Sequence, residues 1–228
     1  MLSVIFVFNN LILNVLSQNF AISCGHFIQI WNLTDTITYY EHSREILSLD
    51  FYENFLIAGG DRYVLYWNYL NSEYLVLDYN DKIVSILILN STHFLAGYQQ
   101  SKIILWTITL NFVDQISKAE PPLEEIIKMK SFSNLSLAVI GEKNHVRIMN
   151  TEEFKILCSS SQTGLKTLEI SPQNLIFLGF NNKIDIYKYN NQKLEKVGSL
   201  NESGEIFSLK FLNAIPDILI IGKKYYIS

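Results

Sequence analysis

The sequence predicts an all-β domain assembled from one repeated unit of about 40 residues. The first observation behind this prediction is that short apolar runs alternate with polar residues and turn formers, with almost no helical periodicity. The second is a segment that ends in a bulky residue followed by a polar one, and that recurs at steps of 36, 39, 43 and 38 residues. The bulky residues of this series are Trp31, Trp67, Trp106, Met149 and Tyr187.

Each unit contains four short segments with the composition of β-strands. The first is repeated closely in residues 45–51, 82–88, 164–170 and 205–211, with Ser48, Ser85, Thr167 and Ser208 at one shared position. The second is an apolar run that ends at Gly59, Gly97, Gly141, Gly179 or Gly222. The third carries the bulky residue, and the fourth is more polar, as in residues 74–77 and 154–158. We therefore expect a four-stranded antiparallel sheet from each unit.

Units of this size cannot bury both faces alone, so neighbouring units must stack, and radial stacking closes into a β-propeller. First strands are expected near Ile12, Ile46, Ile83, Ile126, Leu165 and Ile206, which predicts about six four-stranded blades in a single domain over residues 1–228. The expected blades are residues 11–41, 42–80, 81–120, 121–161, 162–203 and 204–228. The last has too few strands, so residues 3–8 are expected to close it as an N-terminal strand. A fragment of a larger propeller protein, of seven blades or two propellers, remains the alternative.

The chain resembles the WD40-repeat family over nearly its whole length. The best match is the second unit, where His42, Asp61 and Trp67 stand where the family has the His, Asp and Trp of a buried hydrogen-bond network. Gly59 replaces the serine of that network, and the Trp-Asp pair of the family has become Trp-Asn or Trp-Thr in the three units that keep the tryptophan. The resemblance implies a divergent, WD40-like propeller, with His42, Asp61 and Trp67 as a structural network.

Composition and charge disfavour several classes of partner. A net charge of −4 and a pI near 5.6 provide no diffuse positive field for nucleic acid. Residues 1–8 are apolar, but no basic residue precedes them and Asn9 and Asn10 interrupt the run, which favours neither a secretory signal nor membrane insertion. Two cysteines, Cys24 and Cys158, in apolar strand contexts suit a reducing compartment. We expect a cytoplasmic protein.

The sequence offers no recognisable catalytic, metal or cofactor site. None of the four histidines has metal-ligand spacing with a cysteine or carboxylate, and no nucleophile, phosphate-binding or dinucleotide motif occurs. The positions expected to face a central channel, at Asn14, Ser48, Ser85, Lys128, Thr167 and Ser208, form a mostly neutral set. This disfavours the alternative of a propeller enzyme, of hydrolase or oxidoreductase type, with a site in the channel. We expect no enzyme activity, no cofactor and no metal.

The resemblance implies a scaffold for protein–protein interaction, as a subunit of a multiprotein complex. Its partners would be other proteins, bound through loops at the rim and top. The candidate loop residues are Arg44, Arg62, Tyr98, Gln99, Lys143, Asn144 and Asn182. The long connection around Pro121 and Pro122 is a further candidate, because Pro-Pro stiffens it and long loops on rigid scaffolds often bind partners.

Overall fold

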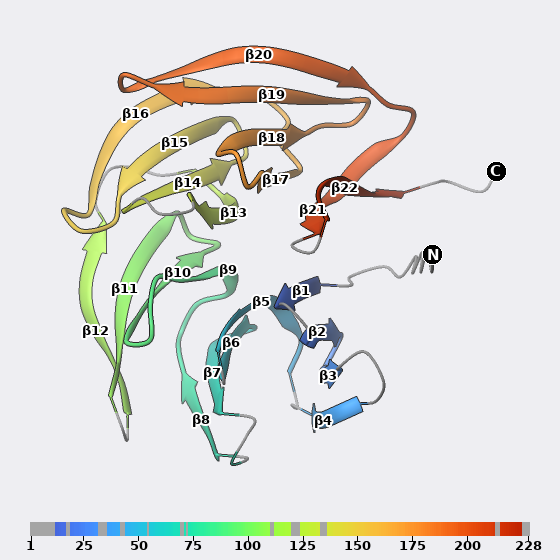
Figure 1. The fold of residues 1–228 in the computed structure, drawn as a ribbon. Helices are drawn as coiled ribbons and strands as arrows, with labels where there is room; N and C mark the ends of the chain where they lie inside the picture. Colours follow the sequence, from blue (N-terminus) through green and yellow to red (C-terminus); the bar gives the residue numbers. More distant parts are fainter. Residues whose placement is uncertain are drawn as a thin grey trace.

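The described residues form six antiparallel sheets arranged in a circle, as expected for a propeller (Figure 1). The structure is a computed structural model, and it describes residues 12–16, 19–31, 36–41, 44–53, 55–68, 71, 73–109, 112–119, 124–132, 136–212 and 215–224. Five sheets have four strands and the last has two, paired in chain order within each sheet. The prediction of an all-β propeller is confirmed, whereas the closing strand expected from residues 3–8 lies outside the described residues.

The strands occupy four positions from the centre of the circle outward. The innermost strands are β1 (Ile12–Leu16), β5 (Ile46–Tyr52), β9 (Ile83–Ile88), β13 (Ile126–Ser131), β17 (Thr167–Ile170) and β21 (Glu205–Leu212). The second strands are β2 (Asn19–Cys24), β6 (Phe55–Gly60), β10 (His93–Tyr98), β14 (Leu137–Glu142), β18 (Leu175–Gly179) and β22 (Ile215–Lys224). The third strands are β3 (Phe27–Trp31), β7 (Tyr63–Asn68), β11 (Lys102–Thr109), β15 (His145–Asn150) and β19 (Lys183–Asn190). The outer strands are β4 (Thr36–Glu41), β8 (Glu73–Asp78), β12 (Phe112–Ala119), β16 (Lys155–Ser161) and β20 (Lys193–Asn201).

Burial decreases from the second strand to the outer strand of a sheet. Every residue of β6 is buried, which explains its continuous apolar sequence, because both of its faces are covered by neighbouring sheets. Outer strand β20 is largely exposed, and its polar side chains face solvent. The turn into β20 uses Asn191 and Gln192, both with positive φ, which is the conformation of a tight two-residue hairpin.

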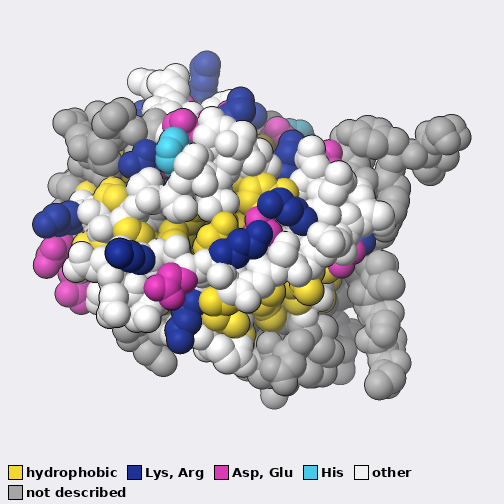
Figure 2. Space-filling model, turned by 90° about the horizontal axis from the view of Figure 1, so that it is seen from above, with side chains coloured by type: hydrophobic (Ala, Val, Ile, Leu, Met, Phe, Trp, Pro, Cys, Tyr) yellow, Lys and Arg dark blue, Asp and Glu magenta, His cyan; other side chains and the backbone are white. Residues whose placement is uncertain are grey.

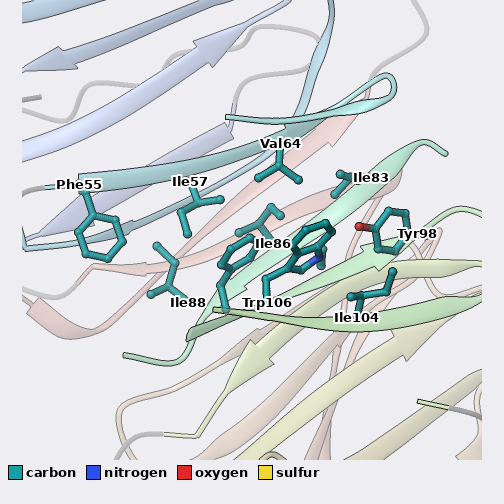
Figure 3. Close-up of a cluster of buried hydrophobic side chains, with 11 residues drawn as sticks. Phe55, Ile57, Val64, Ile83, Ile86, Ile88, Tyr98, Ile104 and Trp106 are labelled. Carbon is teal, nitrogen blue, oxygen red and sulfur yellow. The ribbon is translucent and has the colours of Figure 1, made fainter. Parts of the chain in front are cut away.

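The hydrophobic core lies between neighbouring sheets (Figure 3). The cluster drawn there joins Phe55, Ile57 and Val64 of the second sheet to side chains of the third. The members from the third sheet are Ile83, Ile86, Ile88, Phe94, Ala96, Tyr98, Ile104 and Trp106. Each sheet therefore completes the core of the next, which is the physical reason that the units cannot fold alone.

The repeated serine of the first strand connects neighbouring sheets by hydrogen bonds. The Ser48 hydroxyl accepts from the backbone N–H of Ile86 at 2.7 Å, and the Ser85 hydroxyl accepts from Met129 at 2.9 Å. The Asp50 carboxylate accepts from the backbone N–H of Ile88 at 2.7 Å. Because Ser48 and Asp50 contact residues 86 and 88 in the same order, β5 and β9 run in the same direction around the channel.

A buried carboxylate on β19 ties the fifth sheet to its outer strand. Asp185 is 2% exposed and accepts hydrogen bonds from Lys183 and Ser199, both at 2.7 Å, while Lys196 forms an ion pair with it at 2.8 Å. Burial opposes ionisation, but the hydrogen bonds from Lys183, Lys196 and Ser199 outweigh it and lower the pKa of Asp185 to about 2.

This carboxylate predicts a specific acid sensitivity. The folded pKa lies below the unfolded value of 3.8, so the stabilisation is present above pH 4 and is lost as the pH falls towards 2. Asp185→Asn should lower the free energy of unfolding by about 2 kcal/mol at pH 6, and the difference from the wild type should vanish near pH 2. Urea denaturation of both proteins across this range measures it. If the difference in the free energy of unfolding between the two proteins does not change with pH, the lowered pKa of Asp185 is contradicted.

Candidate functional site

The innermost strands surround a central channel of about 790 Å³. Strands β5, β9, β13, β17 and β21 all contribute lining side chains. The volume falls in the range typical of small-molecule sites.

Two levels of side chains line the channel. The first contains Ser48, Ser85, Lys128, Thr167 and Ser208, the positions that the sequence analysis assigned to it. The second lies two residues further along each strand, on the same strand face, and contains Asp50, Leu87, Lys130, Glu169 and Lys210. Four of the five side chains at the second level are charged.

The charges at the second level alternate along consecutive strands. Lys130 on β13, Glu169 on β17 and Lys210 on β21 follow one another around the ring, and the Lys130 ammonium lies 3.5 Å from the Glu169 carboxylate. Glu169 is 5% exposed. Burial raises its pKa, but the neighbouring charges of Lys130, Lys210 and Lys128 outweigh burial, so the pKa of Glu169 is lowered. It is therefore an anion at neutral pH.

The three lysines differ in how well their charge is compensated. Burial lowers the pKa of Lys130, but the carboxylates of Glu169 and Asp50 outweigh it and raise that pKa overall. Burial, followed by the charge of Lys130, lowers the pKa of Lys128 to about 8. The charge of Lys130, followed by burial, lowers the pKa of Lys210 to about 8. The channel thus holds more positive charge than its carboxylates compensate.

The interpretation of a mostly neutral channel is therefore wrong. It rested on one position in each first strand and missed Asp50, Lys130, Glu169 and Lys210. The period-2 rule would have found them, since residues i and i+2 of a strand point to the same side.

The structure describes two of the three residues of the expected structural network, Asp61 and Trp67. Trp67 lies on β7 and is 3% exposed, but Asp61 is an exposed residue of the turn between β6 and β7. The expectation of a buried Asp61 carboxylate is wrong; its backbone N–H instead donates to the carbonyl of Glu45 at 3.3 Å. His42 lies outside the described residues.

The prediction that Tyr98 belongs to a partner-binding loop is wrong. Tyr98 is the last residue of β10 and is fully buried, with its ring 4.9 Å from that of Tyr79 and 4.7 Å from the ammonium of Lys102. Burial raises the pKa of its hydroxyl. It cannot contact a partner without unfolding the third sheet.

The other described loop candidates lie on turns. Arg62, Gln99, Lys143 and Asn182 are exposed residues of the turns that join second to third strands in the second to fifth sheets, and Asn144, beside Lys143, is half-buried. Arg44 is exposed before β5 and donates to Asp78 at 2.8 Å. Pro121 and Pro122 lie outside the described residues.

A second charged cluster surrounds the turn between β14 and β15. Glu142 is fully buried and accepts from the Arg147 guanidinium at 2.7 Å, while Glu124 lies 3.4 Å from His145. Ligand atoms of Glu124, Glu142 and His145 lie within 4.8 Å of one another, a spacing that suits a metal ion. Because Arg147 already compensates Glu142, we interpret the cluster as an anchor for this turn.

Comparisons with known proteins identify the fold. No family model matches the sequence, and no curated protein matches it. The structure is similar to the crystal structure of the Cps50 (Swd1) beta-propeller domain from Myceliophteria thermophila, with a TM-score of 0.69 and 13% sequence identity. The similarity covers 80% of this chain and 69% of that one. In the part of the chain that the structure describes, no helix has the length and apolarity to span a bilayer.

Proposed function

We propose that this divergent, WD40-like β-propeller is a non-catalytic platform that binds other proteins through the turns on one of its faces. We name this surface the turn face, and define it by Arg44, Arg62, Gln99, Lys143 and Asn182. The proposal extends to membership in a multiprotein complex and to a cytoplasmic location, which the low cysteine content favours.

The observation that carries the proposal is the rigid attachment of these turns. Three of these turns are tied to the chain in front of an innermost strand. The backbone N–H groups of Asp61, Gln99 and Lys143 donate to the carbonyls of Glu45, Lys82 and Glu125, which directly precede β5, β9 and β13. The carbonyls of Arg62, Asn144 and Asn182 accept from residues at the ends of the outer strands. The turns are therefore held from both sides, and little conformational entropy is lost when a partner binds.

Several sheets contribute to the same surface. The turn face takes residues from the second, third, fourth and fifth sheets, which the core clusters lock together. Arginine is enriched at interaction hot spots, and Arg44 and Arg62 are both exposed. Figure 2 shows one side of the molecule, where hydrophobic side chains lie among charged ones. Outer strand β20 also carries two exposed apolar side chains, Val197 and Leu200. A propeller with two such surfaces can bind more than one partner.

The proposal predicts that charge reversal on the turn face removes partners. Arg62→Glu combined with Lys143→Glu should reduce co-purification of stoichiometric partners at least tenfold, because both side chains are exposed and make no core contact. The measurement is affinity capture of the tagged chain from its own cells, with quantitative mass spectrometry.

The matched control places two glutamates on the opposite face. Ser91→Glu combined with Gln173→Glu changes exposed turn residues that follow first strands, so the turn face stays intact. This control should retain the wild-type partner set. If both double variants lose partners equally, or neither does, the turn face is not the binding surface.

A further inference from the structure

Lys128 occupies an unfavourable position in the channel. Its side chain is half-buried on β13, and it forms no hydrogen bond or ion pair with any residue that the structure describes. After burial, the largest influence on the pKa of Lys128 is the charge of another cation, Lys130. A cation without a partner in such a place reduces stability, which is a mark of groups positioned for a ligand.

The charged groups around Lys128 do not compensate its positive charge. Among the described channel-lining residues, five are lysines and three are carboxylates. The charged groups on the strands around Lys128, or directly before them, are Lys130, Lys166, Glu169, Lys210, Glu205, Asp50, Glu45, Lys82 and Glu142. Of these, Lys166 pairs with Glu205 at 3.0 Å, Lys130 lies 3.5 Å from Glu169, and Glu142 is bound by Arg147. None of these ion pairs involves Lys128, and the described lining residues carry more lysines than carboxylates.

Neutral donors are present beside these ammonium groups. The hydroxyl oxygens of Ser48 and Ser85 accept backbone hydrogen bonds from Ile86 and Met129, so each hydroxyl keeps its own proton for donation. Ser85 contacts the residue directly after Lys128, which places its hydroxyl next to the lysine strand. Ammonium groups and free O–H donors in one cavity suit the oxygens of a compact anion.

We infer that the central channel is a binding site for a small multivalent anion of the phosphate-ester class, held by Lys128 with hydroxyl donors from the inner strands. The channel volume of about 790 Å³ accommodates such a ligand together with its organic part. Glu169 limits the affinity, because its carboxylate repels an anion and neutralises Lys130. The site is independent of the proposed protein-binding face, and either can fail without the other.

The experiment is isothermal titration of the full chain with inorganic pyrophosphate at low ionic strength. Wild type should bind at pH 7, and Lys128→Met should weaken binding at least tenfold. Lys193→Met removes an exposed lysine from β20 and should bind as the wild type does. Glu169→Gln should bind several-fold more tightly, because it removes a repelling charge and frees Lys130. A merely structural role for the cluster does not predict this gain.

The pH dependence gives a second readout. With the pKa values of Lys128 and Lys210 at about 8, binding should weaken between pH 7 and pH 9, although pyrophosphate itself gains negative charge over that range. Chemical denaturation should show Lys128→Met to be at least as stable as the wild type at pH 7, so loss of binding is not loss of fold. Absence of binding to the wild type at pH 7, or weaker binding by Glu169→Gln, overturns the inference.

Discussion

Trp67→Ala is expected to lower the free energy of unfolding by about 3–5 kcal/mol. Trp67 lies on β7 with 3% of its surface exposed, in the cluster that fills the space between the first and second sheets. Ile30, Leu49 and Leu65 belong to the same cluster. Removing the indole leaves a cavity that these strands cannot close, because their positions are set by hydrogen bonds on both sides.

Tyr74→Ala provides the control for this prediction. Tyr74 stands opposite Trp67 in the register of β7 and β8, but it is 62% exposed. Its replacement should cost less than about 1 kcal/mol, since little apolar surface is returned to water. Equilibrium denaturation in urea measures both variants. Similar losses for the two would show that burial between sheets does not dominate the stability of this blade.

Gly59→Val is expected to destabilise the protein by about 3 kcal/mol, at the upper end of the range for overpacked cores. A Cβ at Gly59 would lie 2.4 Å from a methyl group of Ile83 on the next innermost strand. Ile83 is itself fully buried, so it cannot move away without displacing the third sheet. The glycine near the end of β6 is therefore required by the close approach of neighbouring sheets.

The control is a glycine with space around it. At Gly198 on β20 an added Cβ would meet Ile186 at an ordinary contact distance of 3.6 Å. Gly198→Val should change the free energy of unfolding by less than about 1 kcal/mol, and valine's preference for strands acts in its favour. Thermal and urea denaturation of both variants test the difference. Equal effects would contradict an inter-sheet role for Gly59.

The fold could be predicted because its information is local and repeated. Alternation along residues 45–51 and 82–88 gave two innermost strands, and the spacing of Trp67 and Trp106 gave the blade period. The sequence also shows the recurring glycine, but it does not show why a glycine is needed there. From the sequence, Gly59 is interpreted as the replacement of a serine of the hydrogen-bond network. The distance to Ile83 shows that close packing of two sheets excludes any side chain there.

Burial of individual polar residues could not be predicted in the same way. Tyr98 is the last residue of a second strand, and Asp61 lies in the turn that follows another. Tyr98 is fully buried, whereas Asp61 is exposed. The difference comes from Tyr79 and Lys102, which cover Tyr98 from the outer part of its sheet and its neighbour. Such contacts depend on how two units are placed, which no single repeat encodes.

The sequence by itself determined the strands, their order and their repetition, because period-2 alternation and turn residues act over a few neighbouring positions. The coupling between the channel charges was decided by the tertiary structure. Asp50, Lys130, Glu169 and Lys210 lie up to 160 residues apart in the chain, and only closure of the ring brings their charges into one cavity. Electrostatic coupling between them depends on distance in space, and together with burial it lowers the pKa values of Lys128 and Lys210 to about 8.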